Sequence, residues 1–360
     1  MTPIFVNGRF LTQQTTGVQR FAREIVKALD ALLVAEGNRV RRRIVLLMPT
    51  GAAAPAGLHM IESRTVGVLR GHPWEQLELP RHTRGGVCLN LCNTAPLAGR
   101  STVVAIHDAG VFAVPAAYSR PFRLWYRLLH AQLGRRAVRI LTLSEFSRAE
   151  LGRHVGIAPD RITIIPAGGE HILAEPADSR ILQRLGLKGR YVLAVSSRSP
   201  HKNFAGIQAA MKLIRHRDIT LVFAGGANPR IFRSGEELSD DSCMAGRVTD
   251  PELRALYESA ECFVYPSFYE GFGFPPLEAM TSGCPVVVSR AASLPEVCGE
   301  AAVYCDPNDP ADIGRALDEV LESAELRTEL RRRGKERAGQ FTWSRSGTAL
   351  LGLLDGVPAQ

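Results

Sequence analysis

The stretch 262–289 constrains the fold more than any other part of the chain. The apolar run Cys262–Tyr265 is followed by proline and predicts a buried parallel strand. A loop rich in glycine and proline comes next, and the pattern then predicts a helix from about Pro275 to Ser282 and a second strand at Pro285–Val288. A strand, a loop and a helix N-terminus in this order form the usual place for an anion in an open α/β sheet.

Two carboxylates, Glu270 and Glu278, lie eight residues apart on either side of the loop glycines. They can therefore face one ligand from two sides. Gly271 and Gly273 permit positive φ angles and let the amides of the segment 271–274, which includes Phe272 and Phe274, approach a phosphate or carboxylate closely. The loop is suited to presenting amides, although a loop of this composition can also simply turn the chain.

A dinucleotide-binding fingerprint is excluded for this loop. The sixth position of G-x-G-x-x-G is Pro276 rather than glycine, and no acidic residue lies at a strand end about 20 residues further on. We therefore reject a dehydrogenase.

The segment E-G-F-G-F-P-P-L-E, followed by A-M-x-x-G-x-P-V-V, resembles the E-x7-E signature of the GT-B retaining glycosyltransferases of family 4. The similarity extends from T-G-V-Q-R near the N-terminus to F-T-W near the C-terminus. This resemblance implies an α/β protein of GT-B fold, with two Rossmann-like doubly wound domains facing a cleft.

The length of 360 residues suits two domains of about 170 residues each. There is no run of 18 apolar residues, and the N-terminus leads directly into a predicted strand, so we expect neither a membrane span nor secretion. Seven cysteines without a C-x-x-C pair favour reduced thiols in a cytoplasm over disulfides or a zinc site. The formal charge of +8 admits nucleic acid, anionic membrane or phosphorylated small molecules as partners, but no nucleic-acid motif is present.

In the first half of the chain, strands and helices alternate, which is typical of a doubly wound sheet. His107 follows one predicted strand at the edge where such sheets bind ligands, and the resemblance implies that it faces the donor sugar. Gly17 opens an amphipathic helix, and the resemblance implies that its amide approaches the donor. The predicted strands are Ile4–Val6, Arg43–Met48, Val87–Leu91, Thr102–Ile106, Arg139–Leu143 and Arg161–Ile165.

The segment Phe122–Val138 predicts a basic helix with Leu124, Leu128 and Leu129 on one side. Such a helix can lie on an anionic membrane or cover the sheet. The polar stretch 167–189 is expected to link the domains. We expect an acceptor-binding domain at 1–170 and a nucleotide-sugar-binding domain at 171–342, with a final helix at 343–354 packing back on the first.

The second half repeats the α/β pattern from Tyr191 onwards. Arg198 and Lys202 lie four residues apart beside a predicted helix N-terminus, where two cations can cradle a diphosphate. Gly225 follows the predicted strand Ile219–Ala224 and is a donor-binding candidate, as is Val248, in a segment that resembles the one whose backbone meets the nucleotide base.

The resemblance implies transfer of a sugar from a nucleotide diphosphate to a hydroxyl acceptor, with retention at the anomeric carbon. Glu270 would hold sugar hydroxyls, and Glu278 the ribose hydroxyls. Arg198, Lys202 and the loop amides would neutralise the leaving diphosphate, and His107 would touch the sugar. The chain has no D-x-D pair, so neither a metal nor another cofactor is expected.

The expected donor is GDP-mannose, from the general resemblance to bacterial polysaccharide-assembly enzymes. The acceptor would be a saccharide or lipid-linked saccharide, with the protein cytoplasmic or peripheral on the cytoplasmic face of the membrane. A nucleotide-sugar epimerase of the same fold and a binding protein without turnover remain alternatives.

Overall fold

The computed structural model describes residues 2–37, 43–195, 199–216, 218–226 and 242–358. The chain divides into two compact units. The first contains Met1–Ala109, Leu124–Ala167 and Trp343–Gln360, and the second contains Gly110–Arg123 and Gly168–Thr342. The final helix thus belongs with the N-terminal unit, while the short segment Gly110–Arg123 lies with the second.

The first unit is built on a seven-stranded parallel sheet with the order β3-β2-β1-β4-β5-β6-β7. Its apolar runs form buried central strands because both faces of the sheet are covered by helices. The chain order reverses between β1 and β4, which makes their carboxyl ends the topological switch point. The strands are β1 (Ile4–Asn7), β2 (Ile44–Met48), β3 (Glu62–Thr65), β4 (Val87–Asn90), β5 (Thr102–Ala105), β6 (Arg139–Thr142) and β7 (Ile162–Ile164).

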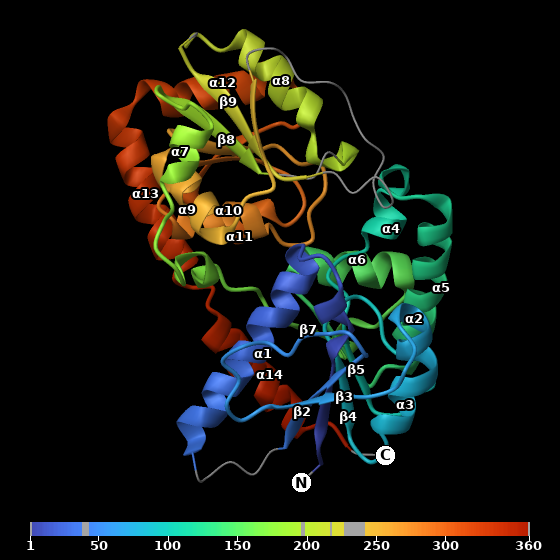
Figure 1. Cartoon of the computed structure of the whole chain (residues 1–360). Coiled ribbons are helices and arrows are strands. Elements are labelled where there is room, and N and C mark those ends of the chain that lie inside the picture. Colours follow the sequence, from blue (N-terminus) through green and yellow to red (C-terminus); the bar gives the residue numbers. More distant parts are fainter. Residues whose placement is uncertain (1, 38–42, 196–198, 217, 227–241, 359–360) are drawn as a thin grey trace. The chain divides into compact units, whose positions relative to one another are not determined.

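Helices α1 (Gly17–Glu36) and α14 (Trp343–Asp355) pack side by side in this unit (Figure 1). The ring of Phe21 on α1 meets that of Trp343 with centroids 5.9 Å apart. The π-helical turn Trp74–Glu78 packs its tryptophan against β2 and β4. The remaining elements along this part of the chain are η1 (Gly8–Thr12), α2 (Gly71–Pro73), α3 (Leu79–His82), α4 (Gly110–Ala113), η4 (Pro115–Ala117), α5 (Arg120–Arg136), α6 (Glu145–Val155) and η5 (Pro159–Arg161).

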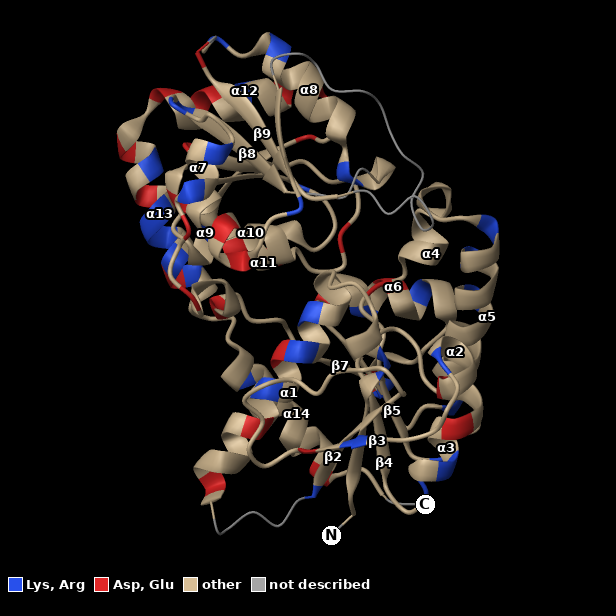
Figure 2. Cartoon of the chain, viewed as in Figure 1, with Lys and Arg blue, Asp and Glu red and all other residues tan. Residues whose placement is uncertain are grey.

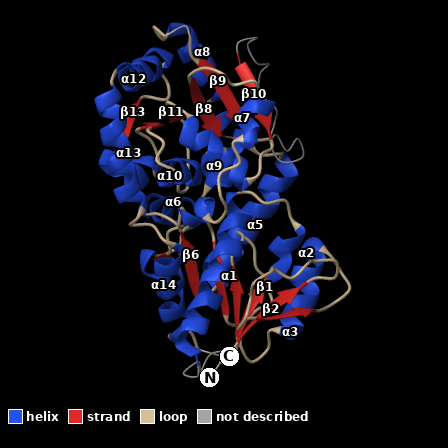
Figure 3. Cartoon of the chain, turned by 60° about the vertical axis from the view of Figure 1, so that its left-hand side comes forward, coloured by secondary structure: helices blue, strands red, loops and turns tan. Residues whose placement is uncertain are grey.

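The second unit has a six-stranded parallel sheet with the order β10-β9-β8-β11-β12-β13. Its switch point lies between β8 and β11. Figures 1 and 3 show the helices around this sheet, and an apolar cluster joins its strands to α8 (Phe204–Leu213) and α12 (Pro310–Glu322). The strands are β8 (Tyr191–Val195), β9 (Thr220–Ala224), β10 (Ser242–Gly246), β11 (Cys262–Tyr265), β12 (Val286–Ser289) and β13 (Ala302–Cys305).

Helices lie between these strands along the chain. The helices along this part of the chain are η6 (Glu170–Leu173), α7 (Arg180–Arg184), η7 (Pro200–Lys202), α8 (Phe204–Leu213), α9 (Asp250–Ser259), α10 (Phe274–Thr281), α11 (Leu294–Cys298), η8 (Gly299–Ala301), α12 (Pro310–Glu322) and α13 (Ala324–Ala338).

The two doubly wound sheets confirm the predicted fold class, and the predicted strands agree with the observed ones to within one or two residues. Two strands were missed, β3 and β10. Both are edge strands: β3 reads ESRT and is largely exposed, and β10 reads SCMAG, with an apolar run of only three residues. Edge strands bury little surface, so hydrophobic periodicity does not reveal them.

Two local predictions were wrong. The stretch 167–189 is more than a linker, because it contains η6 and α7 and buries His171 and Ile172. Helix α5 was expected to have its leucines on one side, but Leu129 is buried with Leu133, whereas Leu124 and Leu128 are 62% and 58% exposed. The residues packed against α5 select the buried face, and leucine spacing along the helix does not reveal them.

Candidate active site

The candidate site of the second unit lies at the switch point of its sheet. Strands β8 and β11 are neighbours there, and Lys202 follows β8 while Glu270 follows β11. The carboxyl ends of parallel strands at such a point form the crevice in which open α/β proteins bind ligands. Two residues 68 positions apart in the chain are thereby brought together.

Lys202 and Glu270 form a largely buried ion pair, with Nζ and Oε1 2.5 Å apart. The ammonium also donates to Tyr265 Oη at 2.8 Å and lies 5.2 Å from the centre of that ring. Burial acts to lower the pKa of Lys202, but the Glu270 charge and the Tyr265 contact outweigh it and raise the pKa above its usual range. Burial acts to raise the pKa of Glu270, which Lys202 and His201 nevertheless hold below its ordinary value. Both groups are therefore charged.

Asn203 fixes the turn that carries Lys202. Its φ is +57°, and its side chain caps α8 by accepting from the Gly206 amide at 3.2 Å. The same side chain donates to the carbonyls of Pro266 and Pro307, at 3.1 and 2.7 Å. Asparagine tolerates the left-handed conformation better than most residues. The turn after β8 is thus tied directly to the loop after β11.

The glycine loop enters α10 through Gly273, whose φ is +117°. A Cβ atom there would come within 3.0 Å of Leu294 Cδ2, so this position needs glycine for conformation and for space. Ser293 Oγ fixes the loop by donating to the carbonyls of Glu270 and Phe272, at 2.9 and 2.7 Å. The amides of Gly271–Phe274 and the side chain of Glu270 are therefore presented by one rigid turn.

Glu278 lies on α10 and is nine-tenths buried. Its Oε1 accepts from His171 Nε2 at 2.9 Å, and Tyr257 Oη lies 3.4 Å from its Oε2. Three separate elements thus contribute to this second carboxylate. A carboxylate oriented in this way can accept two hydroxyl hydrogens from a vicinal diol.

His201 lies next to Lys202, and its Nδ1 is 2.8 Å from Ser199 Oγ. Burial and the neighbouring Lys202 charge lower the pKa of His201 to about 4. This imidazole is therefore neutral near pH 7, and it adds no positive charge to that of Lys202.

The other predicted donor residues of this unit lie at the same edge of the sheet. Gly225 follows β9 with a φ of +130°, and its amide donates to the Gly246 carbonyl at 2.7 Å. Val248 lies between β10 and α9 and is half-buried. Arg198 falls outside the described residues.

His107 and Gly17 belong to the first unit. His107 follows β5, its Nε2 donates to the Leu91 carbonyl at 2.9 Å, and its amide donates to Asn93 Oδ1 at 2.7 Å. Burial lowers the pKa of His107 to about 4, so the imidazole is neutral with its proton on Nε2. Gly17 begins α1, and Thr16 before it is the N-cap residue. The amide and the hydroxyl of Thr16 both donate to Gln19 Oε1.

Sequence reasoning missed several contributors to this site, among them Tyr265, Tyr257, His171, Asn203 and Ser293. Tyr265 was read only as the end of a strand, and His171 lay within the supposed linker. No spacing in the sequence ties His171 to Glu278, because the two residues lie 107 positions apart. Among the described residues, no three His, Cys, Asp or Glu side chains gather where they could hold a metal ion.

Two family models match the chain. Residues 179–337 match the model described as glycosyl transferases group 1, and residues 81–170 match the one described as glycosyltransferase family 4. The chain is 35% identical to the O-antigen chain mannosyltransferase B of Escherichia coli, over 69% of this chain and 68% of that protein. It is 31% identical to the MMP alpha-(1->4)-mannosyltransferase of Mycolicibacterium hassiacum, over 61% of this chain and 55% of that protein.

Solved structures share the fold at lower sequence identity. HepE of Anabaena, in complex with UDP and glucose, matches with a TM-score of 0.75 and 16% identity over 99% of this chain and all of that one. WaaG, a glycosyltransferase involved in lipopolysaccharide biosynthesis, matches with a TM-score of 0.68 and 17% identity over 98% of this chain and all of that one. These matches and the E-x7-E loop show that the chain belongs to the family 4 (group 1) glycosyltransferases of GT-B fold and is a hexosyltransferase.

Proposed function

We propose that this protein transfers a mannosyl group from a nucleotide-diphosphate sugar to a hydroxyl acceptor during assembly of a bacterial polysaccharide or glycolipid. GDP-mannose is the first candidate donor, and the product retains the anomeric configuration. The 35% identity to a mannosyltransferase that builds O-antigen chains supports the sugar and the setting. The observation that carries the proposal is the Lys202–Glu270 pair at the switch point of the second sheet.

The proposed roles follow from charge. Negative charge builds on the diphosphate as its bond to the sugar breaks, so a fixed cation stabilises the transition state more than the ground state. Lys202 supplies that cation, and Arg198 is proposed to act beside it. Glu270 limits the local excess of positive charge and accepts hydrogen bonds from sugar hydroxyls. Glu278 accepts from the ribose hydroxyls, and His107 contacts the sugar.

We propose that the reaction needs no divalent metal ion. Lys202 and the amides of the glycine loop take the part that a metal plays where a D-x-D pair binds one. The buried position of Lys202 strengthens its interaction with a phosphate relative to an exposed lysine.

The test is to incubate the protein with GDP-mannose alone and then with GDP-mannose and a mannose-containing oligosaccharide or lipid-linked acceptor. Release of GDP and growth of the acceptor only in the second mixture supports the proposal, and product NMR reads the anomeric configuration. A changed free nucleotide sugar in the first mixture would instead indicate an epimerase. Binding of GDP-mannose by calorimetry without turnover in either mixture would indicate a binding protein.

A peripheral contact with the cytoplasmic face of a membrane is part of this proposal. The α5 patch, defined as Val68, Leu69, Leu77, Leu124, Trp125 and Leu128, holds six large apolar side chains that are exposed. His72, between Leu69 and Leu77 in the chain, meets the Trp125 ring with centroids 5.4 Å apart, which joins the two segments.

Figure 2 shows basic positions along α5, and arginines flank the patch in the sequence. Apolar side chains with surrounding arginines fit an anionic lipid surface. No described helix is both long and apolar enough to cross a membrane.

Vesicles of phosphatidylcholine with and without phosphatidylglycerol test this contact. We expect binding only to the anionic vesicles, weakening as salt rises because exposed charges are screened over about 8–10 Å. The variant Leu124→Ser/Leu128→Ser should bind less, whereas Leu213→Ser, at a leucine 56% exposed in the second unit, should not change binding. Equal binding by both variants, or none by the unmodified protein at low salt, contradicts the contact.

A further inference from the structure

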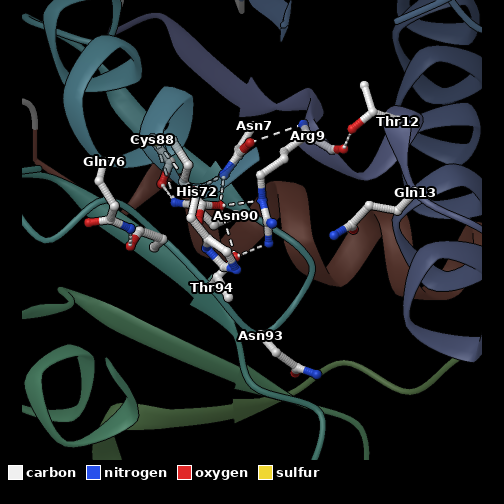
Figure 4. Close-up of polar contacts among 12 residues, drawn as sticks. Asn7, Arg9, Thr12, Gln13, His72, Gln76, Cys88, Asn90, Asn93 and Thr94 are labelled. Atoms are coloured by element: carbon white, nitrogen blue, oxygen red, sulfur yellow. Dashed lines mark hydrogen bonds and ion pairs between the residues drawn. The ribbon is translucent and has the colours of Figure 1, made fainter. Parts of the chain in front are cut away.

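A buried polar network occupies the switch point of the first sheet. Asn7 at the end of β1 donates to Asn90 Oδ1 at the end of β4, at 2.8 Å. Arg9 and Glu75 form an ion pair here, with Nε and Oε1 3.1 Å apart, and Glu75 is completely buried. Thr94 completes the network, and Figure 4 shows the side chains of Asn7, Arg9, Asn90 and Thr94 close together.

Glu75 is the acceptor that binds the network together. Its Oε1 accepts from Asn7 Nδ2 at 2.8 Å, from Arg9 Nε at 3.1 Å and from Thr94 Oγ1 at 2.8 Å. Its Oε2 lies 3.4 Å from His72 Nδ1. Burial acts to raise the pKa of Glu75, but contacts with His72, Arg9, Thr94 and Asn7 hold it below its ordinary value. The carboxylate is thus kept charged inside the protein.

Stability alone does not explain a buried ion pair at this point. Removing two charges from water costs several kcal/mol per ion, and apolar side chains of similar volume are often as stabilising or more so. The carboxyl ends of β1 and β4 are also the place where an open sheet of this kind binds ligands. A charged network at this edge is better explained by the residues whose positions it fixes.

The network holds the segment Leu91–Thr94 from one side. Arg9 Nη2 donates to Thr94 Oγ1 at 2.7 Å, and Asn90, which precedes the segment, is held by Asn7. Asn93 has a φ of +61°, a conformation that costs energy for a residue with a side chain. Asparagine tolerates this conformation better than most residues, and the surrounding contacts fix it here.

On its other side the same segment holds His107. The Leu91 carbonyl accepts from His107 Nε2, and Asn93 Oδ1 accepts from the His107 amide. Asn93 is itself fixed, because its amide donates to the Ala105 carbonyl at 2.9 Å and its carbonyl lies 3.0 Å from His130 Nε2. Both the backbone and the ring of His107 are therefore attached to Leu91 and Asn93, which lie in the chain between Asn90 and Thr94, the two positions that the network contacts.

We propose that Arg9 and Glu75 are positioning residues for His107: they anchor Leu91–Thr94, and this segment sets the tautomer and orientation of the imidazole. The inference rests on the proposed function, in which His107 contacts the donor sugar. Neither residue needs to touch a substrate. The neutral imidazole with its proton on Nε2 keeps Nδ1 as the ring atom that can accept a hydrogen bond.

The kinetic test compares Glu75→Gln in two backgrounds. In the otherwise unmodified protein it should lower kcat on the order of tenfold, because a misplacement of less than 1 Å is enough for such a loss. In the His107→Ala background, the same change should cost almost nothing further, since Glu75 acts through His107. Equal losses in both backgrounds overturn the proposal.

Asp30→Asn is the matched control. Asp30 is also a buried carboxylate of the first unit, and it accepts from the amides of His59, Met60 and Ile61, in the segment just before β3. It should lower the unfolding temperature and leave kcat unchanged. If Glu75→Gln does not fold, the pair Arg9→Met/Glu75→Leu removes both charges together and takes its place, with the same expected dependence on His107.

A second measurement needs no activity. The imidazole 15N signals of His107 report the Nε2-protonated tautomer, and they should change in Glu75→Gln but not in Asp30→Asn. Unchanged signals contradict the positioning role even if the enzyme is active. Absence of mannosyl transfer by the unmodified protein would instead count against the proposed function, and the NMR comparison would still decide the positioning role.

Discussion

Lys202 and Glu270 face each other across the switch point of the second sheet, with Nζ and Oε1 2.5 Å apart and both side chains largely buried. The pair contributes one cation and one anion to a single point, so a diphosphate can interact with Lys202 while Glu270 keeps the ammonium charged. The first prediction therefore concerns the Lys202–Glu270 contact.

Lys202→Ala should lower kcat by about 10²–10³, with a much smaller rise in KM, because a cation fixed at developing charge acts mainly in the transition state. Initial rates against donor concentration measure both. The single change also leaves Glu270 buried without its cation. The variant Lys202→Met/Glu270→Gln removes both charges and should recover stability without recovering activity. Recovery of activity in that double variant would show that the pair is structural.

Glu278→Ala should weaken GDP binding more than tenfold, because hydrogen bonds to a charged group contribute about 1.5–3 kcal/mol each. Isothermal titration calorimetry checks this. His171→Gln retains a donor for Glu278 Oε1 and should bind GDP within a few-fold of the unmodified protein. If Glu278→Ala keeps full affinity, the ribose assignment fails.

Gly273→Ala should weaken nucleotide binding, because the φ of +117° and the close Leu294 side chain force the loop to shift. Gly156→Ala is the comparison. Gly156 has a φ of +75° at the end of α6 and no atom within 4 Å of an added Cβ. Both changes should cost on the order of 1–3 kcal/mol of stability through backbone strain, but only Gly273→Ala should change affinity. Equal affinities for GDP would mean that the loop conformation is not required for binding.

Chelation should leave activity unchanged. Treatment with EDTA followed by dialysis removes divalent ions, and we expect the same initial rate before and after. Activity that disappears with EDTA and returns with magnesium or manganese would contradict the assignment of the phosphate contacts to Lys202 and the loop amides.

Stability should fall with acid between about pH 6.5 and pH 4.5. Burial lowers the pKa of His107, His130 and His201 to about 4, from an ordinary value of 6.5. In this window the unfolded chain binds protons that the folded protein does not, so unfolding becomes more favourable as pH falls. Each histidine adds a slope of up to about 1.4 kcal/mol per pH unit. The shifted carboxylates Glu75 and Glu270 act at lower pH, below their unfolded pKa near 4.5.

Denaturant unfolding at steps of pH measures this slope. His130→Gln keeps a donor toward the Asn93 carbonyl. This variant should reduce the dependence of the unfolding free energy on pH by the contribution of one histidine, up to about 1.4 kcal/mol per pH unit. A slope that does not change in this variant would mean that His130 titrates normally in the folded protein.

The sequence by itself determined the local elements and the loop chemistry. Apolar runs such as Cys262–Tyr265 predicted central strands, because a strand covered on both faces must be apolar along its length. The glycine loop before α10 could also be predicted, because a positive φ depends on residues only a few positions away. The spacing of Glu270 and Glu278 also needed only the chain itself.

Only the tertiary structure decided which distant residues meet. The Lys202–Glu270 and His171–Glu278 contacts join residues 68 and 107 positions apart, and both depend on strand order, which local spacing does not encode. The buried face of α5 was mispredicted because packing partners select it, and the Arg9–Glu75 network was missed because its members come from separate turns around one switch point. Local sequence sets the conformation of each turn, whereas burial at the sheet edge sets which charges must pair.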